Sequence, residues 1–401
     1  MLQRLMEIHE LIVSKKYKHI KRYLFEKINW DAQAICIVGS RGTGKTTMMI
    51  QHYHAIYGTA EKALYISADH ILVVSHGLYE IADMYFKIGG QALYIDEIHK
   101  YTNWSVELKN IIDVYSDKQI IISGSSTIAL SKSKGDLSRR VVYYELKGLS
   151  FREFLLFKQK KDYGISSLKN IITKHREKSL EIKKDIPVLK YFKNYLLYGY
   201  YPFFMEGVDD YFSKLQNVIE KVIYEDIATS FNLSQPKLPV LKKLLWIIAS
   251  SEPFTPNIDR ISRELGISRQ TVYHYIEYLE RAGFILNIRK AGMGMKAVRK
   301  PGKIYMENTG LIKVVSEVSG MASITGTIRE TFFANQLNSV ASISIPKRTD
   351  FFVEDKFYFE IGGKNKSFSQ ISELKNSYLA LDDIEVGAGR KIPLYLFGFL
   401  Y

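Results

Sequence analysis

The clearest chemical pattern lies near the N-terminus, in an eight-residue segment that is rich in glycine and ends in lysine and threonine. The segment Gly39-Ser-Arg-Gly-Thr-Gly-Lys-Thr46 has the spacing G-x-x-x-x-G-K-[ST]. The glycines let backbone N–H groups curl around phosphate oxygens without Cβ clashes. The lysine then reaches the β- and γ-phosphates, and the threonine hydroxyl ligates Mg²⁺. The pattern predicts a site for ATP with Mg²⁺, formed by Gly39, Ser40, Arg41, Gly42, Thr43, Gly44, Lys45, Thr46 and Thr47.

Two adjacent acids, Asp96 and Glu97, follow a short apolar run. Ligands of open α/β sheets bind at the carboxyl ends of the strands, so both carboxylates are expected beside the phosphates. We expect Asp96 to support the Mg²⁺ shell and Glu97 to polarise the attacking water. The alternative is a pair of exposed acids at the start of a helix. A water-activating acid favours hydrolysis over phosphoryl transfer to a small molecule.

Hydroxyl and guanidinium groups follow further along the same part of the chain. Residues 123–126 read Ser-Gly-Ser-Ser after an apolar run, and we favour Ser125 as a γ-phosphate sensor or water-orienting group. A helix N-cap explains the same hydroxyls equally well. Arg140 is the candidate finger for the developing charge. Arg139 and Arg140 can equally be ordinary surface bases.

Short apolar runs alternate with helical stretches over the first 150 residues. This alternation predicts an α/β domain with a parallel sheet that ends near Ser150. The helical stretches include 79–86 and 106–115. The predicted strands are Ala34–Val38, Ala63–Ile66, Ala92–Ile95, Ile120–Ile122 and Val141–Tyr144.

Composition bounds the class of protein and its partners. A chain of 401 residues predicts two or three domains. The net charge of +14 favours a polyanionic partner such as nucleic acid, although a lysine-rich solvated surface gives the same balance. One cysteine, Cys36, suits a reducing cytoplasm, and no apolar run approaches the length of a membrane span. We therefore expect a cytoplasmic protein with no membrane partner.

Together, the glycine-rich loop, the acid pair, residues 120–126 and Leu149–Phe154 resemble prokaryotic ATPases of the AAA+ superfamily. The resemblance continues through four later segments, Leu197–Pro202, Gly266–Leu279, Lys303–Leu311 and Phe359–Lys364. It implies an AAA+ core with a P-loop parallel sheet, followed by a helical connector, a winged helix-turn-helix and a small α+β tail like the restriction-endonuclease fold. The implied boundaries are 1–150, 151–235, 236–318 and 319–401.

The chain departs from the family pattern at two places. The family usually has Gly-Arg where this chain has Arg139-Arg140, so the resemblance gives the finger or sensor role to Arg140. In that role a neighbour's Arg140 would complete the site, which implies a homo-oligomer. The family's Gly-Gly-Phe-Pro segment reads Gly199-Tyr-Tyr-Pro202 here.

A helix-turn-helix pattern occupies residues 258–281. Gly266 suits the turn and Ser268 can cap the second helix. One face is apolar, and it consists of Ile261, Leu265, Val272, Ile276 and Leu279. The opposite face supplies candidate base contacts, which are Arg269, Gln270, Tyr273 and His274. Lys296, Arg299 and Lys300 lie in a predicted wing loop and would suit phosphates. The module can instead serve packing or protein docking.

The tail contains acids that a nuclease of the restriction-endonuclease fold would use. Such an enzyme needs carboxylates for Mg²⁺ and a lysine at the scissile phosphate. Asp350, Glu360 and Glu330 are the acid candidates. The position two residues after Glu360 is Gly362, and Lys364 follows a Gly-Gly break that should end the strand. The sequence therefore predicts a degenerate tail that is either inactive or only binds its partner without cleaving it.

The sequence as a whole predicts a Mg²⁺-dependent ATPase whose turnover switches the C-terminal half on DNA or a protein client. One rival is a metal-dependent nuclease controlled by ATP. The other is an ATP-gated DNA-binding regulator whose hydrolysis is slow.

Overall fold

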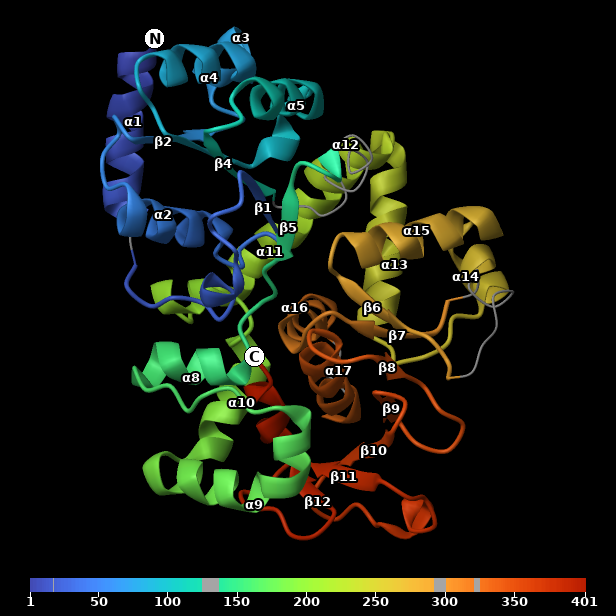
Figure 1. Cartoon of the computed structure of the whole chain (residues 1–401). Coiled ribbons are helices and arrows are strands. Elements are labelled where there is room, and N and C mark those ends of the chain that lie inside the picture. The colour runs from blue at the N-terminus through green and yellow to red at the C-terminus, as the bar shows by residue number, and fades with distance from the viewer. Residues whose placement is uncertain (17, 125–136, 292–300, 321–324) are drawn as a thin grey trace. The chain divides into compact units, whose positions relative to one another are not determined.

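The computed structural model describes residues 1–16, 18–124, 137–291, 301–320 and 325–401. These residues form two compact units, Met1–Lys147 and Gly148–Tyr401 (Figure 1). Within the described residues, none of the helices combines the length and apolar character that crossing a bilayer requires. The first unit has one sheet and the second has two, and each unit is described by itself below.

The first unit is built on a five-stranded parallel sheet. Its strands are β1 (Ala34–Val38), β2 (Ala63–Ser67), β3 (Ala92–Asp96), β4 (Gln119–Gly124) and β5 (Val142–Glu145). Their order across the sheet is β2-β3-β4-β1-β5, and every neighbouring pair is parallel. The strands are continuous apolar runs because both faces of a parallel sheet are covered by helices. The predicted parallel α/β domain is therefore confirmed.

Helices cover both faces of this sheet (Figure 1). They are α1 (Leu2–Lys16), α2 (Lys45–Ile56), α3 (Ile71–His76), α4 (Leu78–Lys87) and α5 (Trp104–Val114), with short 3₁₀ turns η1 (Phe25–Lys27) and η2 (Ile98–Lys100). Successive strand residues point to opposite faces, so Cys36 packs in the core beneath α4 and α5, while Ile35 and Ile37 pack against α2. The helices fix the height and orientation of the strand ends, where the polar side chains of the candidate site lie.

The second unit begins with a helical region. Ser150 caps α8 in a capping box with Glu153, which satisfies two backbone N–H groups at the helix start. The helices are α8 (Phe151–Gln159), α9 (Leu168–Asp185), α10 (Val188–Tyr198), η3 (Pro202–Glu206), α11 (Tyr211–Lys221), the π-helix η4 (Val222–Ile227), α12 (Ala228–Phe231), η5 (Gln235–Lys237), α13 (Leu238–Ala249), α14 (Ile258–Leu265), α15 (Arg269–Arg281), α16 (Thr309–Ser319) and α17 (Thr325–Asn338). The predicted helix, turn and helix are present as α14 and α15.

Two sheets complete the second unit. Strands β6 (Ile285–Ile288) and β7 (Lys303–Met306) follow the helix-turn-helix and pair antiparallel. The other sheet has the order β12-β11-β10-β9-β8. Its elements are β8 (Ile343–Ser344), β9 (Phe351–Val353), β10 (Phe357–Gly362), η7 (Ser369–Ile371), β11 (Ser377–Leu381), β12 (Lys391–Pro393) and the closing turn η8 (Leu394–Phe399). Because β10, β11 and β12 are parallel and β9 is antiparallel, this sheet is mixed.

Two of the segments that carry the family resemblance meet inside the second unit. The Thr309 hydroxyl donates at 2.6 Å to the carbonyl oxygen of Leu196, the residue just before the first of these segments. The Tyr200 hydroxyl donates to the Glu307 carboxylate at 3.1 Å, and Glu307 is buried. Buried polar groups need such partners, so these motifs have a structural role in joining segments distant in sequence.

Candidate active site

The glycine-rich loop connects the end of β1 to the start of α2, as the motif requires. Gly42 and Gly44 have φ angles of 88° and 100°, which side chains rarely tolerate. A Cβ atom on Gly39 would lie 2.3 Å from the carbonyl oxygen of Leu146. Each glycine of the motif is therefore required by the backbone, and α2 begins at Lys45 with its N-terminus at the loop.

The Lys45 ammonium lies within the curl of the loop. Its Nζ donates to the carbonyl oxygens of Gly39 and Ser40, both at 2.9 Å, and the side chain is buried. In this structure the positive charge of Lys45 is stabilised by the negative ends of the two carbonyl dipoles. A phosphate group bound in the loop would contact both this ammonium and the N-terminus of α2.

Arg22 supports the loop from outside, and sequence reasoning missed it. Its guanidinium donates to the carbonyl oxygen of Thr43 at 2.6 Å and to that of Lys147 at 2.8 Å, and the residue is only 5% exposed. A buried arginine that holds two backbone segments fixes the loop relative to the end of the sheet. In the sequence Arg22 is one base in a lysine-rich stretch, so no local signal distinguishes it.

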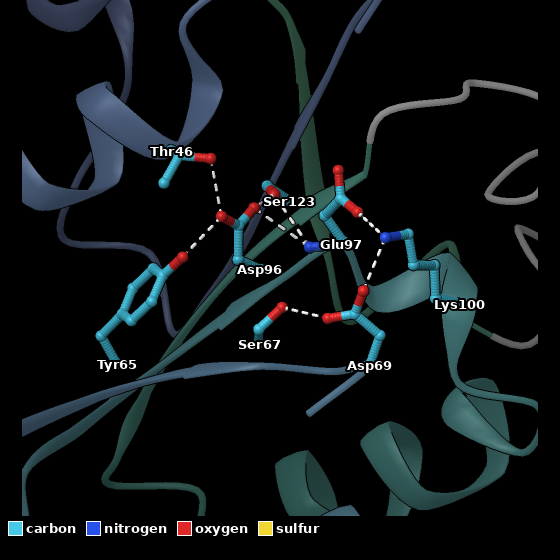
Figure 2. A network of polar contacts seen from close by, with 8 residues as sticks. All are labelled: Thr46, Tyr65, Ser67, Asp69, Asp96, Glu97, Lys100 and Ser123. Atoms are coloured by element: carbon cyan, nitrogen blue, oxygen red, sulfur yellow. Dashed lines mark hydrogen bonds and ion pairs between the residues drawn. The ribbon is translucent and has the colours of Figure 1, made fainter. Parts of the chain in front are cut away.

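Asp96 is the centre of a hydroxyl network at the carboxyl ends of the strands (Figure 2). Its Oδ2 accepts from the Thr46 hydroxyl at 2.6 Å and from the Tyr65 hydroxyl at 2.7 Å. Its Oδ1 accepts from the Ser123 hydroxyl, and the side chain is buried. Burial, together with the negative charge of Asp96, raises the pKa of Tyr65, so the phenol remains a donor. The carboxylate is thereby fixed beside the first turn of α2.

The strand order explains why these particular residues meet. Strands β2, β3 and β4 are neighbours, so Tyr65, Asp96 and Ser123 lie at the same edge of the sheet. Sequence reasoning identified Thr46 and Asp96 but missed Tyr65 and Ser123. The sequence does show a polar residue near the end of each apolar run. Which of these residues contact Asp96 depends on the order of the strands in the sheet, and this order is not visible in the sequence.

Glu97 directly follows β3 in a left-handed backbone conformation, with φ 51° and ψ 41°. This conformation costs a non-glycine residue about 1 kcal/mol or more, and such outliers gather at functional sites. The Glu97 N–H compensates by donating to Asp96 Oδ1 at 3.0 Å and to Ser123 Oγ at 3.3 Å. The backbone of Glu97 is therefore held to the network around Asp96, while its side chain extends away from it.

The Glu97 carboxylate forms an ion pair with Lys100, whose ammonium also contacts Asp69 Oδ2 at 2.6 Å (Figure 2). Burial lowers the pKa of Lys100, but the hydrogen bonds to Asp69 and Glu97 outweigh it and raise that pKa above its usual value. Lys100 is therefore charged at neutral pH. Sequence reasoning did not identify Lys100 or Asp69.

Two other candidates for the site have different outcomes. Ser125 lies outside the described residues, and the described hydroxyl at this strand end is Ser123. Arg140 makes a bidentate pair with Asp113 on α5 of the same chain, through Nε at 2.6 Å and Nη2 at 3.0 Å. Its neighbour Arg139 is exposed. Arg140 must therefore leave Asp113 before it can contact a nucleotide.

The oxygen atoms at Thr46 and Asp96 fit a Mg²⁺ ion, which prefers hydroxyl, carboxylate, water and phosphate oxygens. Across the ranges that the structure describes, no group of three or more His, Cys, Asp or Glu residues could hold a metal ion. Magnesium commonly uses one or two protein oxygens together with substrate phosphates rather than an all-protein cage. The donor set is therefore that of a metal bound together with a nucleotide.

The predicted DNA-contact face of the helix-turn-helix is partly available. Gln270 and His274 are exposed, Tyr273 is half-buried, and exposed Arg269 forms an ion pair with Asp259 of α14. The predicted apolar face is buried at Ile261, Val272, Ile276 and Leu279, but Leu265 is only half-buried because it precedes the turn. The wing-loop bases Lys296, Arg299 and Lys300 lie outside the described residues.

The tail carboxylates are all engaged by other groups. Glu330 on α17 accepts from Lys303 Nζ at 2.8 Å and from the Tyr305 hydroxyl at 3.1 Å. Asp350 accepts from the backbone N–H of Ile361 at 2.8 Å. Burial and then the charge of Glu330 raise the pKa of Asp350 to about 6. The structure thus brings these acids into mutual electrostatic range.

Strand β10 ends at Gly362, the first residue of the Gly-Gly break, so the predicted end of the strand is confirmed. The surroundings of Glu360 differ from the prediction. Glu360 is buried within this strand and is firmly held. Its partner is not Lys364, which is exposed, but Lys366, whose Nζ lies 2.8 Å from Glu360 Oε1. A Cβ atom at Gly362 would lie 2.7 Å from Lys366 Cβ, so the missing side chain makes room for this lysine.

The sheet order, the glycine loop and the acid pair define the first unit as an AAA-type P-loop ATPase fold. Residues 31–155 match the family model of an AAA domain, which agrees with this assignment. Residues 189–322 match a domain of unknown function, DUF8612. Neither family match describes a winged helix or a nuclease-like tail, so both remain predictions.

Part of the chain is similar to a curated protein, the uncharacterized protein MJ1637 of Methanocaldococcus jannaschii. The two are 29% identical over 324 residues, which is 73% of this chain and 66% of that protein. The chain therefore spans about two thirds of the length of this relative.

Solved structures give looser likenesses. The Walker-type ATPase paby2304 of Pyrococcus abyssi matches with a TM-score of 0.41 and 11% identity, over 76% of this chain and 94% of that one. AMPPCP-bound DnaA from Aquifex aeolicus matches with a TM-score of 0.28 and 16% identity, over 69% and 88% of the two chains.

Proposed function

We propose that this chain binds ATP with Mg²⁺ and hydrolyses it. The observation that carries the proposal is the contact between Thr46 and Asp96, 2.6 Å apart at the first turn of α2, with Glu97 next in sequence. This contact joins the hydroxyl that would ligate the metal to the carboxylate that would support it. The AAA domain match over residues 31–155 supports ATP as the nucleotide.

Each residue has a distinct role in the proposed reaction. Lys45 would leave the loop carbonyls and hold the β- and γ-phosphates. Thr46 and Asp96 would hold Mg²⁺, which neutralises charge on the phosphate oxygens when it is bound. Glu97 would accept a proton from water as the water oxygen attacks the γ-phosphorus and the bond to the bridging oxygen of ADP breaks. Ser125 would sense the γ-phosphate or orient the water.

Arg140 would stabilise charge on the transferring phosphoryl group from a neighbouring copy. The exchange of Asp113 for a phosphate is physically reasonable, because each anion can present two oxygen atoms to the two N–H groups of a guanidinium. This role makes the active enzyme an oligomer, and turnover would then depend on protein concentration.

We further propose that turnover switches the second unit on DNA or on a protein client. Exposed polar side chains at the start of α15, Gln270 and His274 among them, support DNA contact, as does the net charge of +14. The alternative is a DNA-binding regulator that is controlled by ATP and hydrolyses it slowly. Tight DNA binding together with slow ATP turnover would favour this alternative. A nuclease remains the rival because Glu360 and Lys366 lie together on β10 and the loop after it.

The test is the ATPase activity of the full chain and of Glu97→Gln, measured with and without Mg²⁺. We expect Mg²⁺-dependent phosphate release by the wild type. The Gln variant should bind ATP normally yet turn over about 10²-fold more slowly, the usual scale for losing a positioned base. Glu80→Gln, an exposed acid on α4, is the matched control and should not change the rate. A Glu97→Gln variant as fast as the wild type would refute this assignment.

A further inference from the structure

The side chain that should activate water is held by a cation in this structure. Lys100 lies at the end of η2, three residues after Glu97, and its ammonium pairs with the Glu97 carboxylate. The same ammonium lies 2.6 Å from Asp69 Oδ2, in the segment that follows β2 (Figure 2). Two acids from neighbouring strand ends therefore share one lysine.

This sharing bears directly on proton transfer. A general base needs a free lone pair within hydrogen-bond reach of the water. An ammonium that occupies the carboxylate blocks that lone pair and holds the side chain in one orientation. The Glu97 and Lys100 side chains are 24% and 27% exposed, so solvent screens their pair less than a fully exposed one.

The backbone limits how Glu97 can be released. Its N–H is held by Asp96 and Ser123, so the Cα position is fixed in the left-handed conformation. Rotation of the side chain about its own bonds is the movement that remains. Asp69 is anchored as well, because it accepts from the Ser67 hydroxyl at 2.5 Å. When Glu97 rotates away, the lysine therefore keeps a fixed anionic partner and need not return to water.

We propose that Lys100 is a positioning residue that restrains Glu97, and that Asp69 competes with Glu97 for its ammonium. This inference rests on the proposed function, in which Glu97 activates water. In the restrained state the Lys100 ammonium occupies the Glu97 carboxylate, and hydrolysis follows release of the carboxylate to the γ-phosphate side. The balance between the two acids then sets the basal rate of turnover.

The inference predicts opposite effects for two substitutions. Lys100→Met removes the restraint and keeps the chain length, so kcat should rise about fivefold, which corresponds to about 1 kcal/mol. Asp69→Asn removes the competing charge, so Lys100 should hold Glu97 more tightly and kcat should fall by a similar factor. KM for ATP should stay within about twofold in both, because neither side chain touches the glycine loop.

Three further variants separate this role from a merely structural one. Lys100→Arg retains the charge and should restore a rate near the wild type. In the Glu97→Gln background, Lys100→Met should have no effect, because the restrained group is already absent. Lys87→Met, which removes a lysine from an exposed pair with Asp83 on α4, is the matched control and should leave kcat unchanged.

The experiment measures steady-state ATP hydrolysis by the full chain, with folding checked by circular dichroism and ATP binding by calorimetry. A folded Lys100→Met variant that is slower than the wild type, or equal to it, overturns the inference. So does an Asp69→Asn variant that is faster. Glu97→Gln at the wild-type rate would instead remove the proposed function itself, so the two failures are distinguishable.

Discussion

Two buried histidines should make the first unit sensitive to mild acid. His9 on α1 accepts a hydrogen bond through Nδ1 from the backbone N–H of Tyr65 at 2.8 Å. His52 on α2 lies 2.6 Å from the Tyr94 hydroxyl and stacks on Trp30 with ring centroids 3.9 Å apart. Burial, followed by a nearby basic side chain, lowers the pKa of each histidine from 6.5 to about 4. Both are therefore neutral in the folded protein near pH 7.

The sign and size of the effect follow from linkage. A histidine whose pKa is lower in the folded state contributes stability that is complete above the unfolded pKa of 6.5 and is lost as the pH falls toward 4. Between pH 7.5 and pH 5, protonation of the unfolded chain costs about 2 kcal/mol per histidine. Both histidines together should cost about 4 kcal/mol, a large part of the stability of an ordinary domain.

Substitution of His9 by Asn isolates its share. The Asn side-chain oxygen replaces Nδ1 as the acceptor for the Tyr65 N–H and does not titrate. We expect the loss of stability between pH 7.5 and pH 5 to fall by about half in this variant. His76→Asn, at an exposed position on α3, is the control and should retain the full loss.

The assay is urea unfolding followed by tryptophan fluorescence in a Trp246→Phe background. The remaining tryptophans, Trp30 and Trp104, both belong to the first unit, so the signal reports that unit alone. Carboxyl groups with lowered pKa values, such as Asp83 and Asp113, titrate below this window. Equal unfolding free energies at pH 7.5 and pH 5 would refute the reasoning, as would a His9→Asn variant with an unchanged pH dependence.

Three further predictions concern the nucleotide, DNA and the tail. Lys45→Ala should weaken ATP binding, measured by calorimetry, at least about tenfold, because a charge-assisted contact to the phosphates is lost. An unchanged affinity would exclude the glycine-rich loop as the ATP site. The full chain should bind DNA weakly, and the affinity should fall steeply as the salt concentration rises. Replacement of Lys296, Arg299 and Lys300 by Glu should abolish this binding. The absence of DNA binding at low salt would instead make the helix-turn-helix region a protein-docking surface. Plasmid, linear and single-stranded DNA should stay intact with Mg²⁺ or Mn²⁺, with or without ATP, because the tail carboxylates are already paired; cleavage that disappears in Glu360→Ala would contradict this.

Much of the first unit could be predicted from its sequence because the relevant signals are local. The glycine spacing encodes positive φ angles at Gly42 and Gly44 and a close backbone approach at Gly39. The apolar runs predict buried strands because both faces of a parallel sheet are covered. Asp96 could be predicted because it follows such a run. A carboxylate at the end of one strand can be recognised without knowing which strands lie beside it.

The tail shows where local reasoning succeeds and where it fails. Two adjacent glycines predict the end of a strand, and β10 does end at Gly362. Counting two positions from Glu360 gave Gly362 and left Lys364 beyond the break, whereas the loop brings Lys366 back over the glycine. The path of a loop is a tertiary property, so this lysine could not be obtained from spacing.

The sequence alone determined the phosphate loop, the acid pair and the parallel sheet, since each depends on residues that are contiguous in the chain. The tertiary structure alone decided which side chains surround them. Tyr65 reaches Asp96 because β2 lies beside β3, Arg22 braces the loop from a distant segment, and Lys100 turns toward both Glu97 and Asp69. These contacts follow from strand order and core packing. Both bring together residues that are distant in the sequence, and no local sequence pattern links them.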